Sequence, residues 1–148
     1  MNSPITSFTG EFRFLSNFWI CPNSFQYRGR NWKTTEQAYQ AAKLKPEHEH
    51  LADLMDEDKI SPSEAKRIGK QIDLREDWNE VRLAVMININ RLKYENNPEL
   101  MQMLLDTKGR ELIEGNNWGD TFWGQSPLGN GRNELGKILM GIRDSFLN

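Results

Sequence analysis

The longest helical pattern in the chain, DLREDWNEVRLAVMININRLKYENN, occupies residues 73–97. Its large apolar side chains recur three or four positions apart, which is the spacing of one face of an α-helix. A helix with an apolar face is stable in water only when other elements cover that face. The chain must therefore fold around one long, partly buried helix. The side chains expected to face the core are Trp78, Val81, Val85, Ile89 and Leu92.

Shorter helices are predicted before and after this segment. In TTEQAYQAAKLK, the alanine content and the capping-box spacing of Thr34 and Gln37 indicate a helix that starts near Thr35. SPSEAKRIGKQI has the same capping spacing at Ser61 and Glu64, with a proline in the first turn. Further helices are predicted over residues 45–58, 97–109 and 133–148, the last one capped by Asn133.

The N-terminal part of the chain has the alternation that is typical of short β-strands. Phe12 and Phe14 alternate with charged residues in EFRFLSNF, and Phe25 and Tyr27 repeat this pattern in SFQYRGRNW. RELIEG, at residues 110–115, is a further candidate strand. Strands and helices do not alternate regularly, which argues against a parallel βαβ sheet. We therefore expect the α+β class: a single compact, mainly helical domain over residues 1–148 with a few short N-terminal strands.

Composition limits the classes of function. One cysteine, Cys21, excludes an internal disulfide framework and a cysteine-based zinc site. A net charge of −2 gives no global attraction to nucleic acid, although a local basic patch stays open. No apolar run reaches the length of a membrane span, and the N-terminus lacks the pattern of a secretory signal. We therefore expect a cytoplasmic protein that uses no metal and no organic cofactor.

The predicted helix that starts near Thr35 has an unusual polar face. Glu36, Tyr39, Gln40 and Lys43 share this face, whereas the alanines lie elsewhere. A helix normally exposes its polar face to solvent, which would make Glu36 and Lys43 surface residues. Alternatively, this face is the wall of a site that holds an acid, an amide, a phenol and an amine. The helix alone leaves both interpretations open.

A second unusual segment is GNNWGDTFWGQSPLGNGRNELG, residues 115–136, which combines glycines with large aromatic residues. Asp120 lies between Trp118 and Trp123, and Arg132 and Asn133 follow. A carboxylate among aromatic side chains suits acid–base catalysis, and glycine backbone with a helix start suits phosphate binding. The alternative is a well-ordered connector whose tryptophans fill the core.

Six segments together resemble the NADAR family of YbiA-like N-glycosidases. They span nearly the whole chain, from Phe12 to Arg143, and their combination is highly specific. Family members often have histidine at the position of Gln37, whereas the preceding Glu36 matches. The matching segments are FRFLSNF, WKTTEQAYQAAK, LREDWNEVRLAVM, LLDTKGRELIEGN, DTFWG and GNGRNELGKILMGIR.

The resemblance implies a compact α+β fold and hydrolysis of an N-glycosidic bond in a phosphorylated ribosyl substrate. Two substrate classes are associated with the family: ribosylamino-pyrimidine phosphates of riboflavin biosynthesis, and ADP-ribose linked to a nucleobase, notably guanine in DNA. The candidate catalytic residues are Glu36, Asp120 and Lys43. The candidate substrate-binding residues are Gln40, Trp78, Arg82, Trp118, Trp123, Gly124, Arg132 and Asn133.

The inventory of the loop favours the ADP-ribosyl class slightly, because Trp118, Trp123 and Arg132 exceed what one small ribosylamine phosphate needs. The partner would then be nucleotide-linked ADP-ribose, with modified DNA as a further candidate. Two other classes stay open. A non-catalytic module that binds ADP-ribose or a nucleotide would use the same aromatic residues and glycines without needing Glu36. A protein-docking domain would expose the aromatic loop to a partner.

Overall fold

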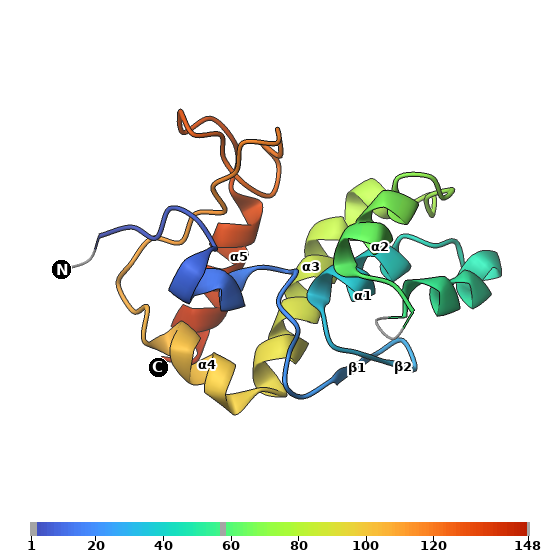
Figure 1. Ribbon diagram of the computed structural model, residues 1–148, viewed down its shortest axis with the longest axis horizontal. Coiled ribbons are helices and arrows are strands. Elements are labelled where there is room, and N and C mark those ends of the chain that lie inside the picture. The colour runs from blue at the N-terminus through green and yellow to red at the C-terminus, as the bar shows by residue number, and fades with distance from the viewer. Residues whose placement is uncertain (1–2, 57–58, 148) are drawn as a thin grey trace. The chain divides into compact units, whose positions relative to one another are not determined.

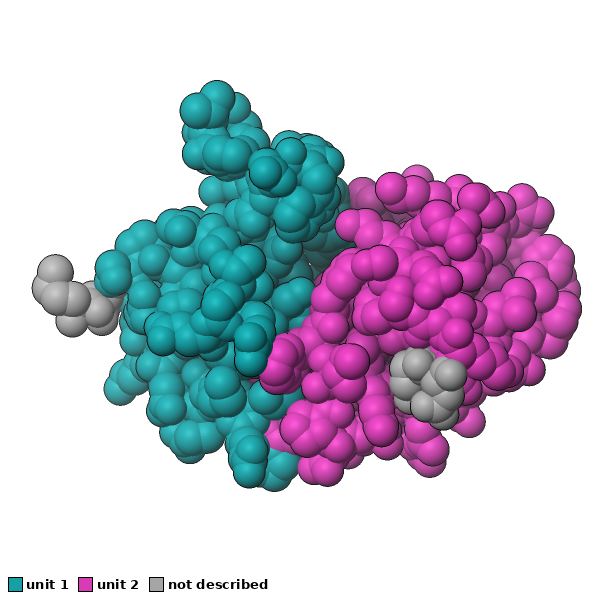
Figure 2. All heavy atoms as spheres, viewed as in Figure 1, with its two compact units in different colours: residues 1–16, 98–148 teal, residues 17–97 magenta. Residues whose placement is uncertain are grey.

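The computed structural model describes residues 3–56 and 59–147 of the chain. These residues form two compact units (Figure 2). The central unit is Asn17–Asn97, and the terminal unit combines Met1–Ser16 with Pro98–Asn148. Over the described ranges, no helix is both long and apolar enough to cross a membrane.

The central unit contains a two-stranded antiparallel hairpin and three α-helices (Figure 1). The strands pair Phe25 with Trp32 and Tyr27 with Arg30. Helix α1 packs against α2, α3 and the 3-10 helix η2. The elements, in chain order, are β1 (Phe25–Tyr27), β2 (Arg30–Trp32), α1 (Thr35–Ala42), η2 (Pro46–Met55), α2 (Pro62–Gly69) and α3 (Trp78–Glu95).

The helix starts predicted in this unit are confirmed. The Thr34 side chain accepts a hydrogen bond from the backbone N–H of Gln37, so α1 begins at Thr35. Ser61 and Glu64 form a complete capping box at the start of α2. Each cap satisfies backbone donors that the first helical turn otherwise leaves without a partner.

The long helix α3 also forms as predicted, but its buried face is broader than the apolar pattern indicated. Trp78, Val85 and Ile89 are buried, whereas Val81 and Leu92 are half-buried. Asn90, Lys93 and Tyr94 are fully buried as well. A pattern of apolar residues does not identify buried polar side chains, which depend on partners from other elements.

One prediction for a short element was wrong, and a second was confirmed as a helix of the 3-10 type. The segment around Phe12 and Phe14 is a 3-10 helix, η1 (Gly10–Leu15), rather than a strand. Two alternating aromatic residues are a weak signal, and no strand of the described residues pairs with this segment. The predicted helix over 45–58 is the 3-10 helix η2, which ends at Met55, and its last two predicted residues, 57–58, lie outside the described residues.

The terminal unit contains η1, α4 (Pro98–Leu105) and α5 (Glu134–Ser145). The candidate strand at 110–115 does not form a regular strand; it makes a single parallel bridge between Leu112 and Ile5. Helix α4 ends at Leu105, four residues before the predicted stop at Gly109. A turn follows, and Gly109 adopts a left-handed conformation with φ of 78°.

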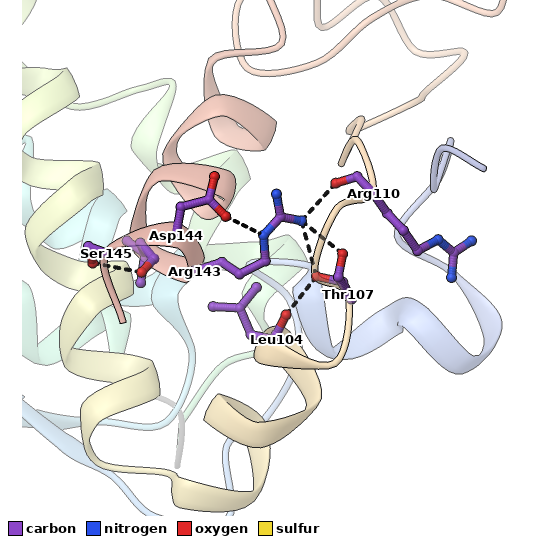
Figure 3. A network of polar contacts seen from close by, with 7 residues as sticks. Leu104, Thr107, Arg110, Arg143, Asp144 and Ser145 are labelled. Atoms are coloured by element: carbon purple, nitrogen blue, oxygen red, sulfur yellow. Dashed lines mark hydrogen bonds and ion pairs between the residues drawn. The ribbon is translucent and has the colours of Figure 1, made fainter. Parts of the chain in front are cut away.

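A buried arginine of α5 binds the turn that follows α4 in the terminal unit (Figure 3). Arg143 of α5 donates through Nη1 to the carbonyl oxygens of Thr107 (3.0 Å) and Arg110 (2.7 Å). Its Nε donates to the carboxylate of Asp144 at 2.8 Å. The guanidinium thus satisfies backbone acceptors in the turn that follows α4.

Candidate active site

The polar face of α1 is buried rather than solvated. Glu36 is 6% exposed and Gln40 is 3% exposed, so the interpretation of Glu36 as a surface residue was wrong. Gln40 Nε2 donates to Glu36 Oε2 at 2.5 Å. A buried carboxylate needs such donors because its lost hydration is otherwise uncompensated. The first half of α1 therefore presents a carboxylate with a fixed hydrogen-bond partner.

Asn17 holds the first turn of α1, and the sequence analysis gave this residue no role. Its backbone carbonyl accepts the N–H of Glu36 at 3.0 Å. Its side-chain Oδ1 accepts the hydroxyl of Thr35 at 2.7 Å. The signal in the sequence that could have pointed to Asn17 is the segment FRFLSNF, which contains it and resembles the NADAR family. Asn17 therefore holds the backbone of the first turn of α1, from which the Glu36 side chain projects.

Gln37 has a structural role in this protein. Its side chain is fully buried, and Nε2 donates to the carbonyl oxygens of Met55 and Ile60, both at 3.1 Å. Its Oε1 accepts the hydroxyl of Thr34 at 2.6 Å. The Gln37 amide therefore links α1 by hydrogen bonds to the end of η2 and to the segment that follows it.

Lys43 lies at the C-terminal end of α1 beside aromatic rings. Its Nζ is 5.2 Å from the centroid of the Tyr39 ring. Tyr39 in turn packs against Trp78, with ring centroids 5.2 Å apart and planes tilted by 56°. Trp78 is itself buried, and its contact with Tyr39 restrains the ring beside the Lys43 amine.

Burial lowers the pKa of the Lys43 ammonium below its usual value, and the nearby Glu36 opposes this shift. Three further cations, Lys66, Lys70 and Arg82, lower the pKa in the same direction as burial. Like charges gathered around one amine repel each other unless an anion neutralises them. The central unit therefore combines a buried carboxylate, a half-buried amine and a local excess of positive charge.

The loop of the terminal unit is ordered by its own polar groups. Asp120 Oδ1 accepts the backbone N–H groups of Phe122 (3.2 Å) and Trp123 (2.9 Å). Asn116 brackets the same residue, because its side chain bonds both the carbonyl and the N–H of Asp120. Through these contacts Asp120 stabilises the conformation of the loop. A catalytic role for Asp120 stays a prediction.

The two tryptophans of this loop are not both buried in the core, as the alternative interpretation of a connector would require. Trp118 is 63% exposed, and Trp123 is half-buried with its ring edge-on to Phe122 at 4.7 Å. The Arg132 guanidinium lies 4.7 Å from the Phe122 ring centroid and forms an ion pair with Glu134 at 2.7 Å. Arg132 is thus engaged within its own unit.

Carbonyl oxygens of the loop accept the backbone N–H groups at the start of α5. The backbone N–H groups of Asn133, Glu134 and Leu135 donate to the carbonyl oxygens of Gly124, Phe122 and Trp123. An anion at a helix start needs N–H groups that point at it, and these three are already used. Gly124 fits closely here, since a Cβ would lie 2.1 Å from the carbonyl oxygen of Glu114.

Asn133 is the N-cap residue of α5, as predicted, but its side chain makes no capping hydrogen bond. The residue adopts a left-handed backbone with φ of 52°. Its side chain instead accepts the N–H of Glu114 and donates to the carbonyl oxygen of Leu112, both at 2.9 Å. The amide lies beside Gly136 in the first turn of α5, but its hydrogen bonds go to the preceding segment.

The structure brings the predicted residues together in two groups, each within one unit. The central unit holds the first group, and the loop of the terminal unit holds the second. The first group is Glu36, Gln40, Lys43, Trp78 and Arg82; the second is Trp118, Asp120, Trp123, Gly124, Arg132 and Asn133.

Comparison with known proteins identifies relatives of the whole chain. N-glycosidase YbiA of Escherichia coli (strain K12) is 32% identical over 144 residues, which cover 95% of this chain and 85% of that protein. The NMR structure of E. coli YbiA matches with a TM-score of 0.81 at 29% identity, over 99% of this chain and 86% of that one. This similarity confirms the α+β fold.

A maize (Zea mays) protein, "Riboflavin biosynthesis protein PYRR, chloroplastic", is 35% identical over 150 residues. The match covers 92% of this chain but only 24% of the maize protein, so this chain corresponds to about a quarter of that relative. The family model described as the NADAR domain matches residues 7–147. The chain therefore belongs to the NADAR domain family.

Proposed function

We propose that the protein is an N-glycosidase that hydrolyses the C–N bond between a phosphorylated ribose and a nitrogen leaving group. The observation that carries this proposal is the buried Glu36 carboxylate of α1 near the Lys43 amine at the C-terminal end of the same helix, close enough to influence its pKa. The name of the E. coli relative, an N-glycosidase, supports the reaction class.

The chemistry of this reaction requires a carboxylate. As the C–N bond breaks, positive charge develops on the ribose C1 and its ring oxygen. The hydroxyl of water adds to C1, and a proton passes to the departing nitrogen. We assign to Glu36 the stabilisation of this charge and the removal of the proton from the attacking water. Gln40 fixes the rotamer of Glu36, which favours one productive geometry.

Lys43 has two roles that suit this reaction. Its lowered pKa increases the fraction of neutral amine, which can add to C1 of the ring-opened ribosylamine, where C1 is an imine carbon. The original nitrogen then leaves as the free amine, and water hydrolyses the new C1–Lys43 imine to release the ribose aldehyde. In its charged form Lys43 joins Lys66, Lys70 and Arg82 as a binding surface for phosphate. Borohydride treatment during turnover separates the two roles, because only the first forms a reducible adduct on Lys43.

The same positively charged group supports a substrate that carries phosphate. Lys43, Lys66, Lys70 and Arg82 suit a ribose that carries phosphate, which both family substrates do. The slight preference for ADP-ribose rested on the aromatic loop, where Arg132 and the start of α5 already have partners within their unit. We therefore propose ribosylamino-pyrimidine phosphates and ADP-ribosyl guanine as the two substrates to compare.

The decisive experiment measures release of the amine or base from each substrate by wild-type protein and Glu36→Gln. Gln has a similar shape and helix propensity, so the fold should be retained while turnover falls by about 10²–10⁴-fold. Glu99→Gln, an exposed change in the first turn of α4, is the matched control and should keep wild-type turnover.

A Glu36→Gln rate within about twofold of wild type would remove Glu36 from the mechanism. Tight binding of ADP-ribose without turnover of either substrate would instead identify a non-catalytic binding module. Melting curves for each variant separate a catalytic defect from a loss of fold.

A further inference from the structure

The side chain of Gln40 lies between Glu36 and the last residue of α2, Gly69. Its Nε2 donates to Glu36 Oε2. Its Oε1 is buried and accepts no hydrogen bond from the part of the chain that the structure describes. This oxygen faces Gly69, since a Cβ built there would lie 1.8 Å from Oε1 and 2.8 Å from the amide carbon.

The glycine at this position is not explained by its backbone. Gly69 is helical and does not have a positive φ, so any L-residue could adopt its conformation. Glycine in a helix is less stable than alanine by roughly 0.5–1 kcal/mol. Among the described residues, the three atoms nearest to an alanine Cβ at this position all belong to Gln40. The absence of a side chain at Gly69 therefore leaves the space in which the Gln40 amide sits.

Two other helical glycines, Gly136 and Gly141, differ from Gly69 in what an added Cβ would meet. A Cβ at Gly136 would lie 2.1 Å from the backbone oxygen of Leu112, which cannot move away without distorting the chain. A Cβ at Gly141 would meet no atom within 4 Å in residues 3–56 and 59–147. At Gly69 the obstructed atoms belong to the end of a flexible side chain, so the fold can accept alanine if the Gln40 amide moves.

We infer that Gly69 is a positioning residue for Glu36 and acts through Gln40. With no side chain at Gly69, the amide is held where its N–H reaches the carboxylate. An added methyl group displaces the amide, and Glu36 then loses its donor and the restraint on its rotamer. The inference rests on the proposed function, because it assigns the consequence of this displacement to catalysis by Glu36.

The test is a double-mutant cycle with Gly69→Ala, Gln40→Ala and the double variant, with Gly141→Ala as the matched control. Gly69→Ala should lower kcat by roughly 10–100-fold, the range expected when a catalytic group is misplaced by about 1 Å. KM should stay within about threefold, because the substrate contacts are unchanged. The melting temperature should not fall, and Gly141→Ala should keep wild-type kcat.

The double variant decides whether the effect passes through Gln40. Once Gln40→Ala has removed the amide, Gly69→Ala has nothing left to displace, so the double variant should match Gln40→Ala alone. Independent effects that multiply would overturn the inference. So would unchanged kcat in Gly69→Ala, a higher KM with normal kcat, or loss of the fold.

A measurement without substrate separates failure of this inference from failure of the proposed function. The side-chain amide signals of Gln40 in ¹H–¹⁵N NMR spectra should shift in Gly69→Ala and stay in place in Gly141→Ala. Unmoved signals would overturn the inference even if the protein is an N-glycosidase. Shifted signals together with full turnover by Glu36→Gln would show that the positioning is real and that the catalytic assignment of Glu36 is wrong.

Discussion

Replacement of Arg143 by methionine should destabilise the protein strongly, because this guanidinium satisfies backbone acceptors in the turn after α4. Two carbonyl oxygens, of Thr107 and Arg110, lose a charged donor. Hydrogen bonds to charged groups contribute roughly 1.5–3 kcal/mol each, which gives about 3–6 kcal/mol for the pair. Removal of a buried charge also removes its desolvation cost, so we expect a net loss of about 2–4 kcal/mol.

Urea unfolding followed by circular dichroism measures this loss directly. Methionine keeps most of the aliphatic volume of arginine, so the change reports the hydrogen bonds more than a cavity. Arg143→Lys should recover about half of the loss, because an ammonium keeps the charge but cannot reproduce the fork of a guanidinium. In a chain of this size, the methionine variant should melt roughly 6–12 °C lower than wild type.

The matched control is Arg91→Met, which removes an exposed arginine that pairs with Glu95 at 3.7 Å on the surface of α3. Such exposed pairs contribute about 0.5 kcal/mol or less. A loss below about 1 kcal/mol in Arg143→Met, or equal losses in the two variants, would refute the role of Arg143 as a link between α5 and the turn after α4.

Two further predictions concern buried groups of the central unit. Because burial lowers the pKa of Lys43 below 10.5, the folded state releases this proton at lower pH than the unfolded chain, and stability rises with pH across that interval. Lys43→Met should therefore be more stable than wild type in urea at pH 7, with an advantage that shrinks as the pH approaches 10.5; an advantage that grows with pH would contradict this. The Tyr94 hydroxyl is buried without a hydrogen-bond partner among the described residues, and burial raises its pKa. Tyr94→Phe should raise the free energy of unfolding by about 1 kcal/mol, and a loss of stability would show that the hydroxyl has a partner.

The local pattern of the sequence was sufficient to predict most of the helical framework. The apolar spacing around Val85 and Ile89 predicted α3, and the capping residues Thr34 and Ser61 predicted where α1 and α2 begin. These features depend on neighbours three or four positions apart, so they can be read without the tertiary structure. The resemblance of six segments to one family extended this to the α+β fold, which the YbiA structure confirms.

The short elements could not be assigned in the same way. A strand needs a partner strand, and the segment around Phe12 has none in the sheet that the structure describes. The type of η1 and η2 depends on which backbone groups are satisfied by the rest of the unit, and not on a pattern within the segment.

The chemical state of the candidate residues was decided only by the tertiary structure. The sequence placed Glu36, Gln40 and Lys43 on one helix face but left open whether that face is solvated. Packing of α2 and α3 against α1 buries the carboxylate and lowers the pKa of the amine. The same reason applies to Asn133, whose amide binds the segment around Leu112 instead of capping α5. Burial and hydrogen-bond partners come from residues distant in the sequence. A local pattern therefore indicates which side chains are candidates for function, whereas their burial, hydrogen bonds and pKa depend on the tertiary structure.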